Sequence, residues 1–230
     1  MTHSDFLLDD FEGICRLFPL PNLVVFPKVV QPLHIFEPRY VEMLEEATRT
    51  DSLIATALLL PGWEAEYDGR PPIDPIVCVG RIISHAPAPE PNRYNVLLAG
   101  VSRAEVVREL PAQRSFREAE ISLLPDFEAD IPQALEATLR ASLISSFYRI
   151  IGKHHALSGQ LQELFREELP LSTLTDLIAY SLPLELVVKQ ALLSENSVLQ
   201  RSRVLDDHLR AAAAEPCEQD RPFPPDFSLN

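Results

Sequence analysis

Three side chains that could do chemistry lie close together near the start of the chain. His34 and Glu37 are of the types that serve as general base and general acid, and Arg39 follows two residues later. His34, however, lies between apolar residues, and Glu37 precedes Pro38, a pairing typical of a helix start, where a carboxylate meets the positive end of the helix dipole. We therefore interpret His34 as a packed or hydrogen-bonded structural histidine, Glu37 as a helix cap, and Arg39 as the electrostatic or packing partner of Glu37.

The pattern needed for a phosphate-binding loop is incomplete. Such a loop uses glycines that bring backbone amides to the phosphates and a lysine that reaches them. The single Gly-Lys pair of the chain is Gly152-Lys153. Phe147 stands where the first glycine should be, and His154 stands where Ser or Thr should be. We therefore expect no ATP hydrolysis.

The signals for a nucleophilic hydrolase and for a metal site are also incomplete. Ser158-Gly159 would need a glycine at position 156 to form a Gly-x-Ser-x-Gly elbow, and that residue is Ala156. Because His154-His155 are adjacent, they point to different faces of a helix, and no Cys or carboxylate spacing completes a metal site with them. The sequence thus predicts no catalytic, metal or cofactor site.

Two aromatic residues lie in a segment that has the composition of a long loop. Trp63 and Tyr67 precede Asp68-Gly69 and Pro71-Pro72, which are turn signals. Aromatic side chains give a large contact area at a low entropic cost, so this pair is our candidate for contacting a peptide or another ligand. The alternative is that the two rings only close the rim of a β core.

Charge and composition exclude several classes of protein. With 230 residues and a formal net charge of -14, the chain has a field that repels phosphate backbones, so nucleic-acid binding is not expected unless arginines gather on one face. No apolar run reaches membrane-spanning length and the first residues are acidic, which predicts a cytoplasmic protein without a membrane partner. Cys15, Cys78 and Cys217 have no close spacing, and we expect free thiols, the first two in the core.

Residues 14–125 have the pattern of strands with one helix. Pro19, Pro21, Pro27 and Pro32 cannot donate to a central ladder, which predicts short, bent or edge strands around them. The other expected elements are a helix over 38–50, a strand over 52–60 that is buried on both faces, a strand over 75–85 with a bulge or bend at Gly80, two strands or one bent strand over 93–110, and a strand over 117–124.

The second half of the chain has helical periodicity. Leu135, Leu139, Leu143, Phe147 and Ile150 recur at helical spacing after an acidic connector. Further helices are expected over 158–169, 172–181, 184–194 and 197–214. We expect flexible termini at 1–13, where a few apolar residues dock loosely, and at 215–230, where prolines predict a disordered tail.

Several ordered motifs resemble one known family. They are Leu17-Phe18-Pro19-Leu20, Val24-Val25-Phe26-Pro27, Pro32 to Tyr40, Val79-Gly80, Tyr94 to Leu98, Gly100, Arg103, Leu174 to Ala179, Leu182-Pro183-Leu184, Val198 and Arg201. This set resembles the Lon protease N-terminal, substrate-binding domain family, in its stand-alone bacterial form without the ATPase and protease domains. The resemblance implies an α+β fold, in which a PUA-like β pseudo-barrel over residues 14–126 with one short helix precedes a helical bundle over 127–214. We interpret its signature residues as structural: Pro32, His34, Phe36, Glu37, Pro38, Arg39, Tyr40, Gly80 and Gly100.

The resemblance and the missing catalytic patterns favour a non-catalytic binding module for polypeptide, either unfolded segments or a partner protein, with an accessory role in protein quality control. Apolar surface, strand edges or the cleft between domains would bind it. Two alternatives stay open. One is an enzyme or small-ligand protein with a pocket between the domains that His34, Glu37 or Arg39 reaches. The other is PUA-like RNA binding through a stripe of arginines, namely Arg81, Arg93, Arg103 and Arg108.

Overall fold

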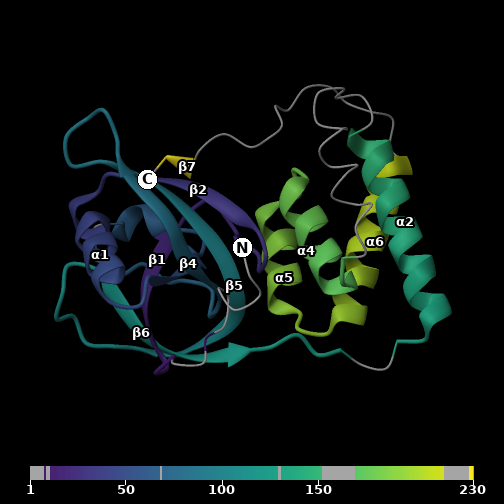
Figure 1. The fold of residues 1–230 in the computed structure, drawn as a ribbon, viewed down its shortest axis with the longest axis horizontal. Helices are drawn as coiled ribbons and strands as arrows, with labels where there is room; N and C mark the ends of the chain where they lie inside the picture. Colours follow the sequence, from purple (N-terminus) through teal and green to yellow (C-terminus); the bar gives the residue numbers. More distant parts are fainter. Residues whose placement is uncertain are drawn as a thin grey trace.

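The computed structural model describes residues 8, 11–67, 69–128, 131–151, 169–214 and 228–229. Strands come first and helices second, so the expected α+β class is confirmed. The strands are β1 (Ile14–Leu20), β2 (Val30–Ile35), β3 (Leu53–Leu58), β4 (Ile76–Pro87), β5 (Tyr94–Glu109), β6 (Arg117–Leu124) and β7 (Ser228–Leu229). The helices are α1 (Pro38–Arg49), α2 (Gln133–Ile151), α4 (Leu171–Ser181), α5 (Leu186–Ser194) and α6 (Val198–Ala214). We call the described residues of 14–124 the β region, and residues 133–151 and 169–214 the helical region, and the two lie side by side as two lobes (Figure 1).

The sheet of the β region closes on itself. Its strands are hydrogen-bonded in the order β4-β3-β1-β6-β5, and β5 also pairs with β4. Closure is possible because β5 is one long, bent strand, whose first half pairs with β2 and whose second half pairs with β6. Helix α1 buries Tyr40, Met43, Leu44 and Ala47 against this sheet, on the face that the helical periodicity predicts. The result is the expected pseudo-barrel, with β2 attached to its outside.

Two glycines sit at the bend of the closed sheet. Gly80 and Gly100 are paired where the register between β4 and β5 shifts, so the bulge predicted at Gly80 is confirmed. A Cβ atom on Gly100 would lie 2.1 Å from the carbonyl oxygen of Phe26, which leaves no room for a side chain. The Gly100 amide also donates to the carbonyl of Val29, and its carbonyl accepts from the Lys28 amide. Gly100 therefore holds the segment before β2 against the sheet.

The prolines are not confined to edge strands. They lie where the hydrogen bonding between two strands ends. β1 pairs with β3 from Arg16 to Leu20, but with β6 only from Ile14 to Leu17. Pro19 lies beyond the end of the second ladder, so its missing N–H removes no bond there. β1 is thus a central strand over its first half, which corrects the simple expectation. Pro32 lies in β2, whose outer side carries only the two-residue strand β7.

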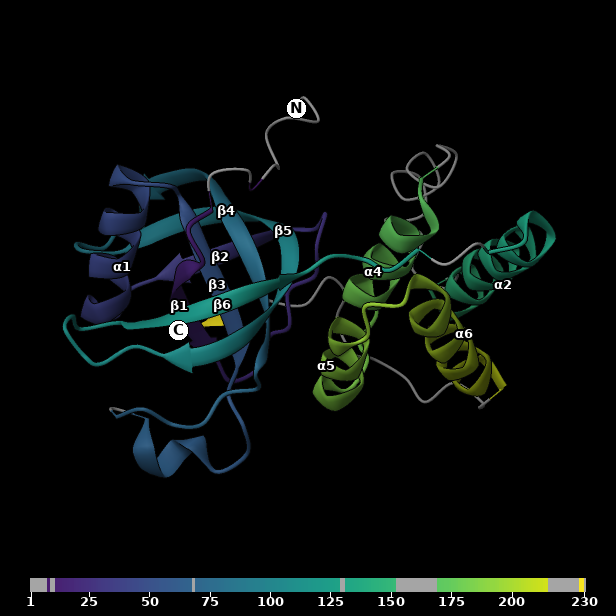
Figure 2. The ribbon, with the colours of Figure 1, turned by 90° about the horizontal axis from the view of Figure 1, so that it is seen from below.

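The helical region packs on the segment that precedes β2. Val24, Val25, Phe26 and Val29 are buried in one cluster with residues of α2, α4, α5 and α6. Two hydrogen bonds add to this contact: the Tyr180 hydroxyl donates to the Gln31 side chain, and the Gln190 amide donates to the Ile76 carbonyl, both at 2.8 Å. Seen from below, α4 and α5 lie nearest the sheet and α2 and α6 lie farther out (Figure 2).

Several smaller expectations have definite outcomes. The strand over 53–58 is buried, as predicted, and Cys15 and Cys78 are free, buried thiols, each with its pKa raised to about 12 by burial. The segment with Trp63 is not an open loop throughout, because residues 63–66 form a 3-10 helix. The helix expected over 158–169 and Cys217 lie outside the described residues. Within the described part of the chain, no helix is long and apolar enough to cross a membrane.

Where the two termini are described, one agrees with expectation and the other differs from it. Leu8 and Phe11 pack against the core cluster around β1, so the start of the chain docks there. At the other end we expected a disordered tail over 215–230. Ser228–Leu229 instead form strand β7, which pairs in parallel with Leu33 and His34. This correction matters for function, since it places an extended segment on the outer edge of β2.

Candidate functional site

Glu37, Arg39 and Tyr67 form one hydrogen-bonded cluster at the start of α1. Glu37 occupies the N-cap position of α1, as expected, but its carboxylate makes no hydrogen bond to the helix amides. It instead accepts hydrogen bonds from the Tyr67 hydroxyl and from Arg39 Nε, the latter at 3.0 Å. Arg39 also donates to the Tyr67 carbonyl and lies over the Tyr67 ring, 4.8 Å from its centroid. The expected partnership of Glu37 and Arg39 is confirmed.

The two aromatic candidates lie beside this cluster. The Trp63 and Tyr67 rings contact each other edge to face with centroids 5.2 Å apart, and both side chains are half-buried. Burial and the hydrogen bond to Glu37 raise the pKa of Tyr67, because both disfavour its ionised form. The structure thus brings Trp63, Tyr67, Glu37 and Arg39 together. A ligand-binding role for the two aromatic residues stays a prediction.

His34 lies apart from that cluster, on the outer face of β2. Its Nδ1 is 2.9 Å from the Asn95 side-chain oxygen on β5, and its ring lies 5.9 Å from that of Phe36. The polar atoms of His34, Glu37 and Arg39 therefore have local partners, and none of the three lines a cavity between the two regions. The pocket alternative loses the candidates that we chose for it.

A different set of charges lies between the two regions. Arg103 on β5 donates to Asp176 on α4 at 2.6 Å and to Asp126 at 3.1 Å. Arg201 on α6 contacts the same two carboxylates at 3.0 Å and 2.9 Å. The side chains of Arg103, Asp176 and Arg201 are each no more than 2% exposed. We call these four residues the inter-region network.

Most polar atoms of the inter-region network have hydrogen-bond partners inside the protein. Arg103 Nε donates to the Leu193 carbonyl at 2.9 Å, and Arg201 donates to the Glu195 carbonyl at 2.7 Å. Burial alone would lower the pKa of Arg103, but the adjacent Asp176 and Asp126 carboxylates outweigh it and raise this pKa. Arg103 therefore stays charged, and it connects β5, the connector and the helices through one guanidinium.

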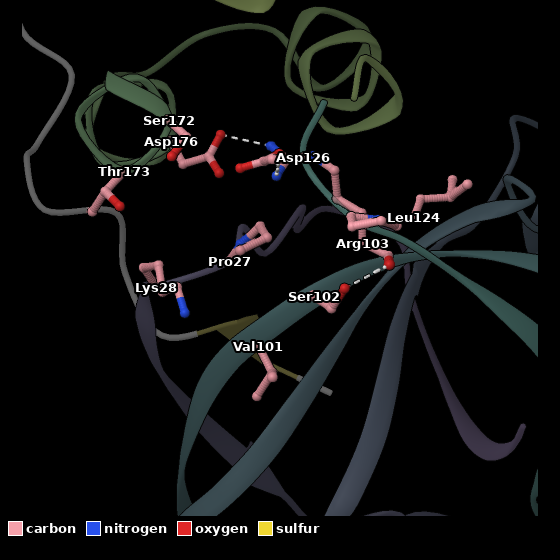
Figure 3. A pocket seen from close by; sticks show the side chains of 11 residues that line it. Pro27, Lys28, Val101, Ser102, Arg103, Leu124, Asp126, Ser172, Thr173 and Asp176 are labelled. Carbon is pink, nitrogen blue, oxygen red and sulfur yellow. Dashed lines mark hydrogen bonds and ion pairs between the residues drawn. The ribbon is translucent and has the colours of Figure 1, made fainter. Parts of the chain in front are cut away.

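A cavity of about 180 Å³ opens beside the inter-region network. Figure 3 shows Arg103, Asp126 and Asp176 at its inner end, with Lys28 and Thr173 also in its wall. A pocket between the two regions is what the alternative of an enzyme or small-ligand protein requires. It is polar, and Arg103, Asp126 and Asp176 in its wall already pair with each other.

From the sequence, Arg201 is only a family-like residue, and Arg103 is a family-like residue and a member of the possible arginine stripe; the partners of both were missed. Asp126 was read as part of an acidic connector, and Asp176 was not singled out. One signal was available: Asp176 stands in an apolar helix beside Leu174, Leu177 and Ile178, where an unpaired charge would be costly. Because Arg103 is buried, it cannot belong to an exposed stripe of arginines, which RNA binding would need.

The outer edge of β2 is the second notable surface. Val30 and Leu97 are 45% and 39% exposed, and Pro32 lies opposite Leu97 on the same face of the sheet. Beside them the backbone edge of β2 pairs with β7 at Leu33 and His34. An exposed strand edge with apolar side chains next to it can accept a further extended strand.

Comparison with known proteins identifies the family. The family model of the ATP-dependent protease La (LON) substrate-binding domain matches residues 14–211. The chain belongs to this family. The Lon protease of Azorhizobium caulinodans is 30% identical over 195 residues, covering 82% of this chain and 22% of that protein. The Lon protease of Rhizobium meliloti is 29% identical and covers 80% and 22%. The chain thus spans less than a quarter of the length of these relatives.

Solved Lon domains have the same fold. The N-terminal domain of a Mycobacterium avium complex Lon protease matches with a TM-score of 0.68 and 18% identity, covering 86% of this chain and 98% of that domain. A Lon N-terminal domain protein from Xanthomonas campestris matches with a TM-score of 0.61 and 20% identity, covering 88% and 99%. The pseudo-barrel followed by helices is therefore the architecture of Lon N-terminal domains.

Proposed function

We propose that this Lon-type domain is a non-catalytic module that binds extended polypeptide along the outer edge of β2. The observation that carries the proposal is strand β7, an extended segment seated in parallel on Leu33 and His34. Membership of a substrate-binding domain family supports it. Within the proposal, the molecule has two functional units, residues 14–126 and 127–214, and acts in the cytoplasm as an accessory in protein quality control.

The β2 edge suits a polypeptide of varied sequence. Backbone groups on a strand edge recognise the main chain of a partner, which is the same in every sequence. The exposed side chains of Val30 and Leu97 add apolar contact beside the edge, and such contact is non-directional. Binding would therefore favour extended, apolar segments, which unfolded proteins expose and folded proteins bury.

Strand β7 would compete with such a segment. Ser228–Leu229 pair with the same β2 residues that an incoming strand would use. A chain shortened to end at residue 227 should therefore bind polypeptide more tightly than the full chain. Equal affinity of the two chains would mean that β7 does not occupy the binding edge.

The test is a titration of the full chain with a fluorescent polypeptide that is kept unfolded by blocked cysteines, followed by fluorescence anisotropy. Val30→Lys should weaken binding about tenfold, because burying one Val contributes roughly 1.5–3 kcal/mol. Val107→Lys is the matched control: Val107 is 58% exposed on the part of β5 that does not pair with β2. Absence of binding at high micromolar concentration, or equal loss in both variants, would contradict the proposal.

A second candidate is a small polar ligand in the inter-region cavity, favoured by its charged and hydroxyl-bearing wall. Such a ligand would contact Lys28 and Thr173 rather than the β2 edge. Lys28→Met would then remove ligand binding and leave polypeptide binding unchanged. Isothermal titration of the unchanged protein and of Lys28→Met with candidate ligands separates the two functions.

A further inference from the structure

Another cavity, of about 240 Å³, lies on the β region and is lined by no residue of the helical region, and its walls are rich in arginine. Arg39, Arg70, Arg114 and Arg117 all line it, from the start of α1, the loop before β4 and the start of β6. Among the described residues that line it, none is an Asp or Glu. This composition is unexpected in a chain with a net charge of -14.

The two least exposed guanidiniums of the cavity are held in fixed positions. Arg117 is paired through Nε and Nη2 with both carboxylate oxygens of Glu109, and its Nη1 donates to the Pro71 carbonyl at 2.8 Å. Arg39 is held by Glu37 and by the Tyr67 carbonyl. Neither Glu109 nor Glu37 lines the cavity. These carboxylates therefore orient the arginines from outside the cavity and leave its interior to another acceptor.

The other two arginines close the cavity from its more exposed side. Arg70 donates to the Leu110 carbonyl at 2.9 Å and lies 3.8 Å from Glu109. Arg114 pairs with Glu46 and lies 3.9 Å from Glu118. The side chains of Arg70 and Arg114 are 38% and 44% exposed, so they can adjust around an incoming group.

The local charges set the kind of ligand. Four arginines are paired with four carboxylates, those of Glu37, Glu46, Glu109 and Glu118, so the charges around the empty cavity roughly cancel. Attraction would come from directed N–H groups instead, since each guanidinium has five N–H donors. A group with several acceptor oxygens and one or two negative charges fits such a site.

We propose that this cavity binds an oxyanion group, either a phosphate or a carboxylate, through Arg39, Arg70, Arg114 and Arg117. The ring of Phe116 and the ring of Tyr40 provide apolar walls for the part of the ligand that carries this group. The site is separate from the β2 edge and does not depend on polypeptide binding.

The test uses the ¹⁵N-labelled full chain titrated with inorganic phosphate and, separately, with acetate, against sodium chloride of equal ionic strength. Saturable shifts should appear in the amides of Gly69, Arg70 and residues 112–117 with at least one of the two anions. Arg70→Gln combined with Arg114→Gln should weaken this binding about tenfold, since each charge-assisted bond is worth more than a neutral one. Both side chains are partly exposed, so the variant should fold.

Arg108→Gln is the matched control, because Arg108 is 63% exposed, pairs with Glu120 and does not line the cavity. It should leave the titration unchanged. Saturation by phosphate alone or by acetate alone supports the site and identifies the oxyanion. Shifts that chloride reproduces, no saturation with either anion, or equal binding by the double variant would each overturn the proposal.

Discussion

Two arginine–carboxylate clusters of this protein use the same chemistry in different surroundings. In the inter-region network, Arg103, Asp176 and Arg201 have almost no contact with solvent. In the cluster at the start of α1, the side chains of Glu37 and Arg39 keep 18% and 20% of their exposure. A charge that loses its partner in the first setting cannot be hydrated, whereas one in the second setting is rehydrated in part. The inter-region network therefore fixes how the two regions meet, whereas the cluster at the start of α1 is available for contacts at the surface.

The largest effect is expected from Asp176→Asn. It leaves the two buried guanidiniums of Arg103 and Arg201 with only the partly exposed Asp126 as a charged partner. Removal of one partner from a buried ion pair destabilises a protein by about 3–5 kcal/mol. Urea unfolding of the full chain measures this loss.

A triple variant shows whether the inter-region network adds to the free energy of unfolding or only fixes how the two regions pack. Replacing Arg103 by Met, Asp176 by Leu and Arg201 by Met together should recover most of the loss, since apolar replacements of a whole buried cluster are often neutral. A loss below about 1 kcal/mol in the single variant would remove the distinction between the two clusters.

Gly100→Ala should have the next largest effect. The new methyl group would meet the Phe26 carbonyl in the segment that contacts the helical region, and backbone cannot rotate away. Overpacking of this kind costs about 1–3 kcal/mol. Gly80→Ala is the comparison, because there the methyl group meets only Leu98 side-chain atoms. Thermal unfolding that ranks Gly80→Ala as the more harmful change would contradict this account of the contact.

Lys189, which links α5 to α4 in the helical region, gives the stability of the protein a dependence on pH. Burial lowers its pKa from 10.5 to about 8, and its Nζ donates to the Tyr180 carbonyl at 2.8 Å. Because the unfolded chain binds this proton more tightly, Lys189 alone contributes a rise in the free energy of unfolding between pH 8 and 10, on the order of 1 kcal/mol per pH unit. Cys15 and Cys78 contribute a fall from about pH 9 upward, because burial raises the pKa of each thiol to about 12 in the folded chain. Above about pH 10 ionisation of tyrosines in the unfolded chain opposes the rise, since burial raises the pKa of Tyr180 in the folded chain.

Lys189→Met should remove this contribution, so that the free energy of unfolding of the variant falls more steeply from pH 8 to 10 than that of the unchanged protein. Urea unfolding of both proteins at several pH values from 8 to 10 measures it. The same slope in the variant would assign the pH dependence to another group.

The smallest effect is expected from Glu37→Gln, which makes the same carboxylate-to-amide change as Asp176→Asn at the more exposed cluster. Its loss of unfolding free energy should be about 1 kcal/mol or less, as for other exposed ion pairs. Parallel urea unfolding of the two variants compares the clusters directly. Equal losses would show that burial is not what separates them.

Much of the fold could be predicted from local patterns. The strand over 117–124 and the helix that begins at Pro38 were placed from alternation, helical periodicity and one proline. The resemblance added the order of a β region and helices. Strand β7 was not predictable, because its pairing with β2 depends on a long-range contact and prolines stand in the sequence shortly before it.

The site was much less predictable than the fold. Glu37 and Arg39 were paired correctly because they are two residues apart, but Tyr67 joins them across 30 residues. The four cavity arginines gave no pattern in the sequence, since they come from separate segments. Their meeting depends on how the sheet closes.

The sequence by itself determined the secondary structure, the family and the absence of a complete catalytic pattern, because these depend on spacing along the chain. The tertiary structure alone decided which charges are buried together. Arg103 meets Asp176 across 73 residues and the Leu193 carbonyl across 90. The physical reason is that the energy of a charge depends on its surroundings, and these form only when β5, α4 and α6 pack together.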